Sequence, residues 1–180
     1  MYEVEVKVPA DLAAVRDRLA ALEATPRGAV VQIDTYYDAP HREFAETDEA
    51  LRIRSERSEA GSDETRVTYK GPLVDDESKT REEVETAVGD RGAMDSILTN
   101  LGFEPAATVR KDRERFALEG YAVTLDSVED VGEYVEVETE VAAEPALESA
   151  REGAYEVLEQ LGLDPDDQLR TSYLGLLLES

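Results

Sequence analysis

The chain has 180 residues, no cysteine, and 43 acidic against 19 basic residues, which gives a net charge of −24. The lack of cysteine excludes disulfides and thiolate metal sites, and the negative charge argues against duplex DNA and anionic membranes, which both require a basic face. No apolar run approaches the roughly 20 residues of a membrane-spanning helix. We therefore expect a soluble, cytoplasmic protein that folds as one domain over residues 1–180.

The basic residues are mostly arginine, with only four lysines in the chain. A large acid excess combined with scarce lysine is typical of proteins from a salt-rich cytoplasm, because such a surface stays hydrated and soluble in strong salt. The composition therefore indicates a halophilic, haloarchaeal-type protein.

Alternation of apolar and polar residues predicts eight strands, near residues 2–8, 29–37, 49–57, 65–71, 80–88, 105–117, 121–129 and 133–143. Helical spacing predicts helices at about 11–23, 91–101 and 146–161, and a short C-terminal helix from Tyr173 to Leu178. Asp11 and Asp90 are placed to cap the first two helices, and Gly102 and Gly162 follow the second and third. Many strands and few helices predict the class α+β, as an eight-stranded antiparallel β-barrel with flanking α-helices.

Most of the predicted strands have one aliphatic face and one ionised face. In the first strand, Glu3, Glu5 and Lys7 alternate with valines. If the helices cover the aliphatic faces from outside, the ionised faces line the lumen of the barrel. This division gives the lumen eight of the 19 bases but only seven of the 43 acids, so the acid excess lies elsewhere. The predicted lumen residues are Lys7, Arg52, Arg54, Lys70, Arg81, Lys111, Arg113 and Arg115, with Glu3, Glu5, Glu83, Glu85, Asp126, Glu136 and Glu138.

Buried ions must be paired with one another or with a charged ligand. Arginine and lysine are suited to phosphate oxygens, and paired carboxylates are suited to Mg²⁺ or Mn²⁺. The pattern thus predicts a metal-assisted polyphosphate site. In so acidic a chain, a single Glu-x-Glu pair is more often a solvated strand face, but three of the four lysines fall on the ionised faces of separate strands. The only histidine, His41, is expected in solvent.

At this point the sequence resembles a known family. Glu3-x-Glu5-x-Lys7 is similar to the signature of the CYTH superfamily, the triphosphate tunnel metalloenzymes. The segments QIDTYYDAP, FAETDEALRIR, TYKGP, SKTREEVET, VRKDRERF, VTLDSVEDVGEYVEVETE and TSYLGLL follow in the family's order over nearly the whole chain. The stretch from Gln32 to Arg54, with TYKGP, resembles the branch named for class IV adenylyl cyclases.

The resemblance implies an eight-stranded tunnel that holds a triphosphate with Mg²⁺ or Mn²⁺, in a chain that forms homodimers in some members. The implied metal ligands are Glu3, Glu5, Asp126, Glu136 and Glu138. The implied phosphate-binding residues are Lys7, Arg52, Arg54, Lys70, Arg81, Lys111 and Arg113. The residues placed at the reaction centre are Glu3, Glu5, Lys7, Lys111, Arg113 and Asp126, with Glu83 and Glu85 lining the tunnel in support. The stretch Arg170–Tyr173 corresponds to a C-terminal plug over one end.

The implied reaction is the conversion of ATP to 3′,5′-cyclic AMP and pyrophosphate. One alternative is a triphosphatase that acts on inorganic triphosphate, thiamine triphosphate or nucleoside triphosphates with the same residues. Another is a module that binds polyphosphate without turnover. The motifs do not separate these reactions, because they share one site and differ in how the substrate lies in it.

Overall fold

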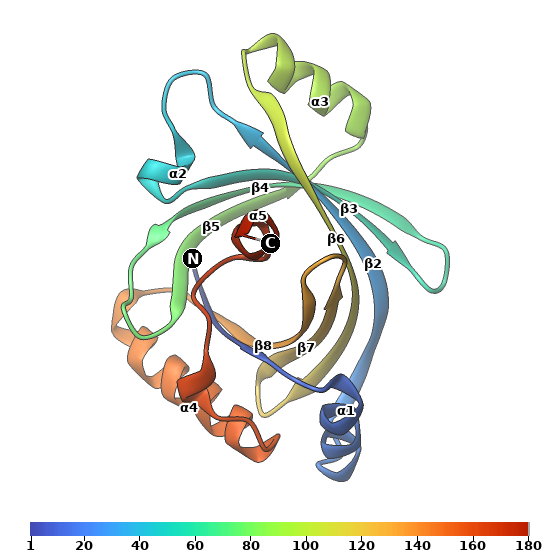
Figure 1. Cartoon of the computed structure of the whole chain (residues 1–180), viewed down its shortest axis with the longest axis vertical. Coiled ribbons are helices and arrows are strands. Elements are labelled where there is room, and N and C mark those ends of the chain that lie inside the picture. Colours follow the sequence, from blue (N-terminus) through green and yellow to red (C-terminus); the bar gives the residue numbers. More distant parts are fainter. Residues whose placement is uncertain (180) are drawn as a thin grey trace.

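The computed structural model describes residues 1–179 and is built around a closed barrel of eight antiparallel strands (Figure 1). The order of neighbouring strands is β1-β5-β4-β3-β2-β6-β7-β8, and β8 pairs with β1 to close the barrel. The predicted α+β barrel is confirmed. The strands are β1 (Tyr2–Pro9), β2 (Thr25–Asp38), β3 (Ala50–Ser58), β4 (Asp63–Leu73), β5 (Lys79–Ala87), β6 (Glu104–Leu118), β7 (Tyr121–Val128) and β8 (Gly132–Val141).

Strand β2 begins earlier than the alternation of residues indicated. Its first residues, from Thr25, pair with β6 through a register shift between Pro26 and Ala29, and Gly28 has φ +94° there. A proline and a left-handed glycine break the period of two, because proline cannot donate to the ladder and bulged residues leave the alternation. The pattern therefore becomes readable only near residue 29.

The predicted helices are present as α1 (Leu12–Ala21), α3 (Arg91–Asn100), α4 (Leu147–Gln160) and α5 (Tyr173–Glu179). Asp11 and Asp90 accept hydrogen bonds from the backbone N–H groups of Ala13 and Ala93, as predicted for N-caps. Sequence reasoning missed two short elements, α2 (Phe44–Thr47) and the 3₁₀ turn at Glu144–Ala146, and a further 3₁₀ turn spans Pro165–Asp167. They are too short to show a helical period. Among the described residues, no helix is both long and apolar enough to cross a membrane.

Helices α1 and α4 cover the outer face of β1, β7 and β8 (Figure 1). Val6, Val123 and Val137 are fully buried there against Leu19 and Leu158. Each such side chain contributes about 1.5–3 kcal/mol relative to an exposed one. The barrel wall is therefore held in place by an outer core, which leaves its inner face free to be polar.

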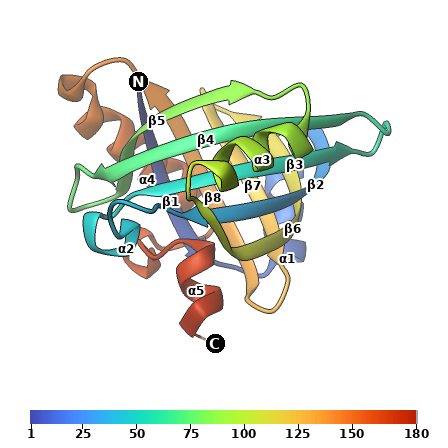
Figure 2. The ribbon, with the colours of Figure 1, turned by 90° about the horizontal axis from the view of Figure 1, so that it is seen from above.

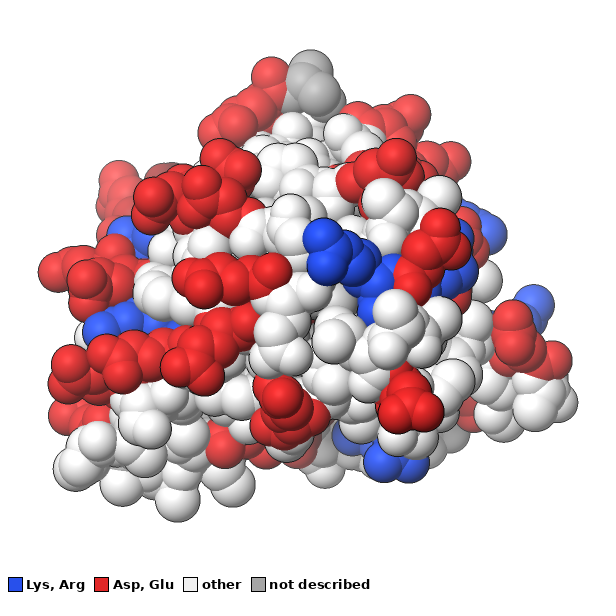
Figure 3. Space-filling model, turned by 90° about the horizontal axis from the view of Figure 1, so that it is seen from below, with Lys and Arg blue, Asp and Glu red and all other residues white. Residues whose placement is uncertain are grey.

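The expectation that helices cover every outer aliphatic face is wrong in part. Ile33 on β2 and Val84 on β5 remain 37% and 58% exposed. Helix α5 is not on the outside wall. It lies over one mouth of the barrel, as Figures 1 and 2 show, and packs with Val109, Val128 and Tyr134. Asp and Glu far outnumber Lys and Arg on the face seen in Figure 3, as expected if the acid excess lies outside the tunnel.

Candidate active site

The strand register brings the predicted ionised residues onto one continuous inner surface. Residues that lie directly opposite each other on paired strands share a face of the sheet. Glu5 lies opposite Glu138 on β8 and Lys79 on β5, and Lys7 lies opposite Glu136. Several of the inward side chains, including Glu5, Lys7 and Glu136, are buried. The split faces of the strands therefore form a charged tunnel.

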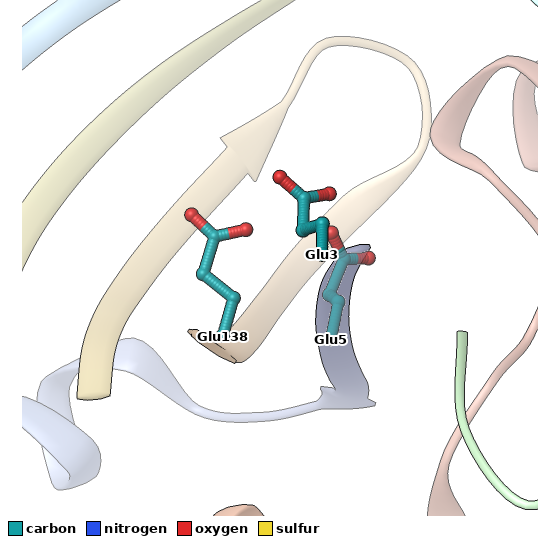
Figure 4. Close-up of side chains that lie close together, drawn as sticks. All are labelled: Glu3, Glu5 and Glu138. Carbon is teal, nitrogen blue, oxygen red and sulfur yellow. The ribbon is translucent and has the colours of Figure 1, made fainter. Parts of the chain in front are cut away.

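Three glutamates form an acidic cluster at one side of the tunnel. Glu3 and Glu5 on β1 lie next to Glu138 on β8, and one carboxylate oxygen from each falls within 4.8 Å of the others (Figure 4). Burial and the charges of Glu3 and Glu5 raise the pKa of Glu138 well above its usual value. Burial and the charge of Glu136 likewise raise the pKa of Glu5. Hard oxygen ligands that repel one another fit Mg²⁺ or Mn²⁺, because a divalent cation would neutralise them.

The other two predicted metal ligands, Asp126 and Glu136, are bound by Arg113. The guanidinium donates to both oxygens of Asp126 at 2.6 Å and to Glu136 at 3.0 Å. Arg113 and Lys7 hold the pKa of Glu136 well below its usual value, although burial acts in the opposite direction. Asp126 also accepts a hydrogen bond from the Tyr173 hydroxyl at 2.7 Å. These two carboxylates thus already have cationic or hydrogen-bonding partners, whereas Glu138 has none within residues 1–179.

A second cluster, on β2, β3 and β6, surrounds the buried carboxylate of Asp34. Arg54 binds both of its oxygens at 2.7 and 2.8 Å, and Lys111 Nζ lies 3.2 Å from Oδ2. Arg52 is more distant, at 3.8 Å. Lys111, Arg54 and Arg52 keep the pKa of Asp34 well below its usual value despite burial. Burial and the charge of Arg54 lower the pKa of Lys111 to about 7. Asp34 therefore fixes three of the predicted phosphate-binding residues.

Lys7 is fully buried beneath the C-terminal segment. Its ammonium group donates to the Thr171 carbonyl and lies 4.3 Å from the centre of the Tyr173 ring, in cation–π geometry. Lys111 lies 5.3 Å from the same ring. Arg170 donates to the carbonyls of Asp75 and Ser78 on the β4–β5 connection. The predicted plug segment therefore lies at the mouth of the barrel that α5 covers, and its Tyr173 contacts Lys7 and Lys111.

Lys70 on β4 completes the lysine set on the acidic side. Its ammonium lies 3.2 Å from Glu3 and 3.6 Å from Glu83. Burial favours the neutral amine, but the charge of Glu3 raises the pKa of Lys70. Lys70 is therefore protonated and close to the glutamate cluster.

Three predicted lining residues lie away from these clusters. Arg81 donates to Asp48 and to the Gly71 carbonyl at the barrel rim. Glu85 is exposed and lies 3.4 Å from the exposed Arg66. Arg115 binds Glu56 at 2.9 and 3.1 Å near the mouth far from α5. The exposed position of His41 is as predicted.

Sequence reasoning missed three charged lining residues, Asp34, Glu56 and Lys79. Asp34 and Glu56 continue the period of two from Gln32 and from Arg54, so the same alternation could have identified them. Lys79 directly precedes the predicted fifth strand and shares its inward phase with Arg81. Its ammonium lies 3.2 Å from Glu5.

Several buried polar atoms of the lining have no hydrogen-bond partner within residues 1–179. These atoms are Gln32 Oε1, Arg52 Nε, Thr68 Oγ1, Glu83 Oε2 and Thr124 Oγ1. Unpaired buried polar atoms are few in folded proteins. Their concentration along one surface fits a polar ligand in the tunnel.

Two cavities, of about 730 and about 400 Å³, lie mainly on the outer wall along β2 and its neighbours. Their linings include outward residues such as Phe116, Ser127 and Ile33 and none of the clustered glutamates. Because a polyphosphate requires concentrated positive charge, we place the candidate site in the tunnel.

The fold and the site together place this chain among the β-barrel proteins whose interior is a tunnel lined with ionised side chains. The chain belongs to the CYTH family, whose CYTH domain matches residues 1–173. CYTH tunnel enzymes bind triphosphate substrates and generally depend on a divalent metal.

The family assignment is supported by relatives of similar length. A protein of Methanocaldococcus jannaschii named "Putative adenylate cyclase" is 37% identical over 177 residues, with 98% of each chain covered. The PH1819 protein of Pyrococcus horikoshii has a solved structure that matches with a TM-score of 0.92 and 38% identity, again over 98% of each chain. A Hippeastrum protein, named "Putative adenylyl cyclase" and described with a dominant triphosphatase activity, shares the fold, with a TM-score of 0.66 and 18% identity over 99% of this chain and 95% of that one.

Proposed function

We propose that this chain is a metal-dependent enzyme that acts on a triphosphate inside the tunnel, with ATP converted to 3′,5′-cyclic AMP and pyrophosphate. The proposal rests on one observation: acidic side chains suited to a metal ion lie beside basic side chains suited to phosphate. The three-glutamate cluster has Lys70 within 3.2 Å of Glu3, and Lys7 lies opposite Glu136 on the strand beside it. The name of the Methanocaldococcus relative supports the choice of cyclase.

Each cluster would have a separate task. Glu3, Glu5 and Glu138 would hold Mg²⁺ or Mn²⁺, which when bound neutralises phosphate charge and makes the attacking hydroxyl more acidic. Lys7, Lys70, Lys111 and Arg52 would bind phosphate oxygens, and Arg52 Nε is free to donate. These donors are fixed before the substrate enters, so little reorganisation opposes charge development on the leaving pyrophosphate.

Arg54 and Arg113 would have a different role from the one that the resemblance implied. Each guanidinium already uses two N–H groups on a carboxylate, Asp34 or Asp126. Each would bind phosphate only through its remaining N–H groups, and would mainly hold its neighbours in place. Asp126 and Glu136 would accordingly support the metal site from beside it.

A triphosphatase is the second candidate function, and the dominant triphosphatase activity described for the Hippeastrum protein favours it. The same residues would then bind the triphosphate so that water attacks a terminal phosphorus. The two reactions differ in which phosphorus faces the nucleophile.

Product analysis distinguishes these reactions. The protein is incubated in molar KCl with Mn²⁺ and ATP, or with inorganic triphosphate, and the products are separated. Cyclic AMP with pyrophosphate supports the cyclase. Orthophosphate without a cyclic product refutes the cyclase and supports the triphosphatase. Binding without turnover under any divalent metal contradicts both and supports a polyphosphate-binding module.

Variants test whether the tunnel is the site. Glu138→Gln removes one proposed metal ligand and should abolish turnover, whereas Glu82→Gln, on the exposed outer face of β5, should not. Lys7→Glu should abolish triphosphate binding under all three candidate functions. Intact binding by the Lys7→Glu variant would show that the ligand lies elsewhere.

The homodimer, the salt-rich environment and the cytoplasmic location stay predictions. The exposed Ile33 and Val84 are apolar side chains on the outer wall that a second copy of the chain would cover in a homodimer. Light scattering in molar KCl would measure the oligomeric state.

A further inference from the structure

Lys79 is the one lysine to which neither the motifs nor the family resemblance gave a role. It is the first residue of β5 and lies directly opposite Glu5 of β1. Its side chain is 11% exposed, and its ammonium group is 3.2 Å from Glu5 Oε1. Lys79 therefore neutralises one carboxylate of the three-glutamate cluster.

All four lysines of the chain lie on the tunnel lining. The side chains of Lys70, Lys79 and Lys111 are 15%, 11% and 3% exposed, and Lys7 is completely buried. Arginine, in contrast, occurs both in the tunnel and on the surface, as at Arg57, which is 73% exposed. Lysine differs from arginine in having a compact point charge on a flexible stem, and in this chain it occurs at tunnel positions, whereas arginine also occurs on the surface. Because all four lysines lie on the tunnel lining, we expect Lys79 to do more than balance the charge of Glu5.

We propose that Lys79 is a further phosphate-binding residue, held by Glu5 in the metal-free tunnel and transferred to a phosphate oxygen when a divalent cation binds Glu5. The inference deepens the proposed function and rests on it. The four-carbon stem of lysine permits such a movement.

The exchange of partners makes Lys79 act on the two ligands in opposite directions. Before the substrate enters, its ammonium competes with the cation for Glu5 and weakens metal binding. After the cation has bound, the freed ammonium strengthens triphosphate binding. A lysine that only stabilised the fold would, on removal, weaken both ligands, and a lysine that only bound phosphate would leave the metal affinity unchanged.

The test measures both affinities by titration calorimetry in molar KCl. The probes are Mn²⁺ alone, and an ATP analogue with methylene groups at both bridging positions, titrated in saturating Mn²⁺. For Lys79→Met we expect Mn²⁺ to bind roughly three- to tenfold more tightly and the analogue to bind roughly tenfold more weakly, where tenfold corresponds to about 1.4 kcal/mol. Lys79→Arg, which keeps the charge, should leave the Mn²⁺ affinity close to that of the wild type.

Arg57→Met is the matched control, because it removes one positive charge from an exposed side chain on the outer face of β3. It should change neither affinity by more than about twofold. If Lys79→Met does not fold, Lys79→Gln retains a donor for Glu5 and should show the same opposite shifts. Weaker or unchanged Mn²⁺ binding, or unchanged analogue binding, in the folded variant would overturn the inference. A wild-type protein that binds neither probe would instead overturn the proposed function.

Discussion

Replacing Arg113 with methionine should strongly destabilise the barrel even without any ligand. Arg113 is 7% exposed and makes the three charged hydrogen bonds to Asp126 and Glu136 described above. Methionine keeps much of the volume but leaves two buried carboxylates without their cation. Removing one partner of a buried ion pair costs about 3–5 kcal/mol, because the remaining charge is desolvated and uncompensated.

The size of the effect on melting follows from the size of the chain. For domains of 150–250 residues, 1 kcal/mol shifts the melting temperature by about 2–4 °C. We therefore expect Arg113→Met to melt roughly 6–20 °C below the wild type. Adding Asp126→Asn should recover part of the loss, because a neutral amide has a smaller desolvation cost than a carboxylate.

The assay is thermal unfolding followed by circular dichroism at neutral pH in molar KCl. Arg57→Met again serves as the control, since its exposed pair with Asp63 should contribute at most about 1 kcal/mol. In the wild type, the folded pKa of Glu136 is below its unfolded value, so its contribution is present above about pH 4.5 and is lost as the pH falls. The deficit of Arg113→Met should shrink in the same direction. Equal melting temperatures for Arg113→Met and Arg57→Met would refute the reasoning.

Three further predictions concern pH, the plug and salt. The folded pKa of Lys111 is lowered to about 7 from 10.5, so the unfolded chain binds more protons between these two pH values and the free energy of unfolding rises with pH. Lys111→Met should reduce this dependence of the unfolding free energy on pH, measured by urea titration. An unchanged dependence would contradict the burial of the Lys111 charge. Tyr173→Phe loses the hydrogen bond to Asp126 and should lower the free energy of unfolding by about 1.5–3 kcal/mol. Tyr2→Phe is the control, because the Tyr2 hydroxyl donates to Glu144 at an exposed site. Equal losses in the two variants would contradict the prediction. With a net charge of −24, the melting temperature should fall when KCl is lowered from molar to about 0.1 M, and constancy would argue against a halophilic protein.

Strand positions and faces could be predicted because the alternation of residues is a local property. In β1, the period of two in Val4, Glu5 and Val6 directly sets which side chains point inward. The number of strands and the scarcity of helices then predicted the barrel, and the family resemblance implied the same fold. Local pattern failed where backbone irregularity intervened, as at Pro26 and Gly28 in β2.

The pairing of ions inside the tunnel could not be predicted, because it depends on register between strands that are distant in sequence. Glu136 and Glu138 look equivalent in the sequence, yet Arg113 from β6 reaches Glu136, while Glu138 meets Glu3 and Glu5. Arg81 lies directly opposite Glu3, yet its guanidinium donates to Asp48 and to Gly71, beside the register shift of β4 between Lys70 and Leu73. That irregularity places the Gly71 carbonyl within 2.7 Å of its guanidinium.

The most direct test of the tunnel as a metal-assisted triphosphate site is a crystal structure with Mn²⁺ and the bis-methylene ATP analogue. Anomalous scattering locates manganese independently of the protein atoms. We predict a peak among the carboxylates of Glu3, Glu5 and Glu138, with phosphates against Lys7 and Lys111. A fully bound analogue on the outer wall, or manganese that does not contact these glutamates, would contradict the account.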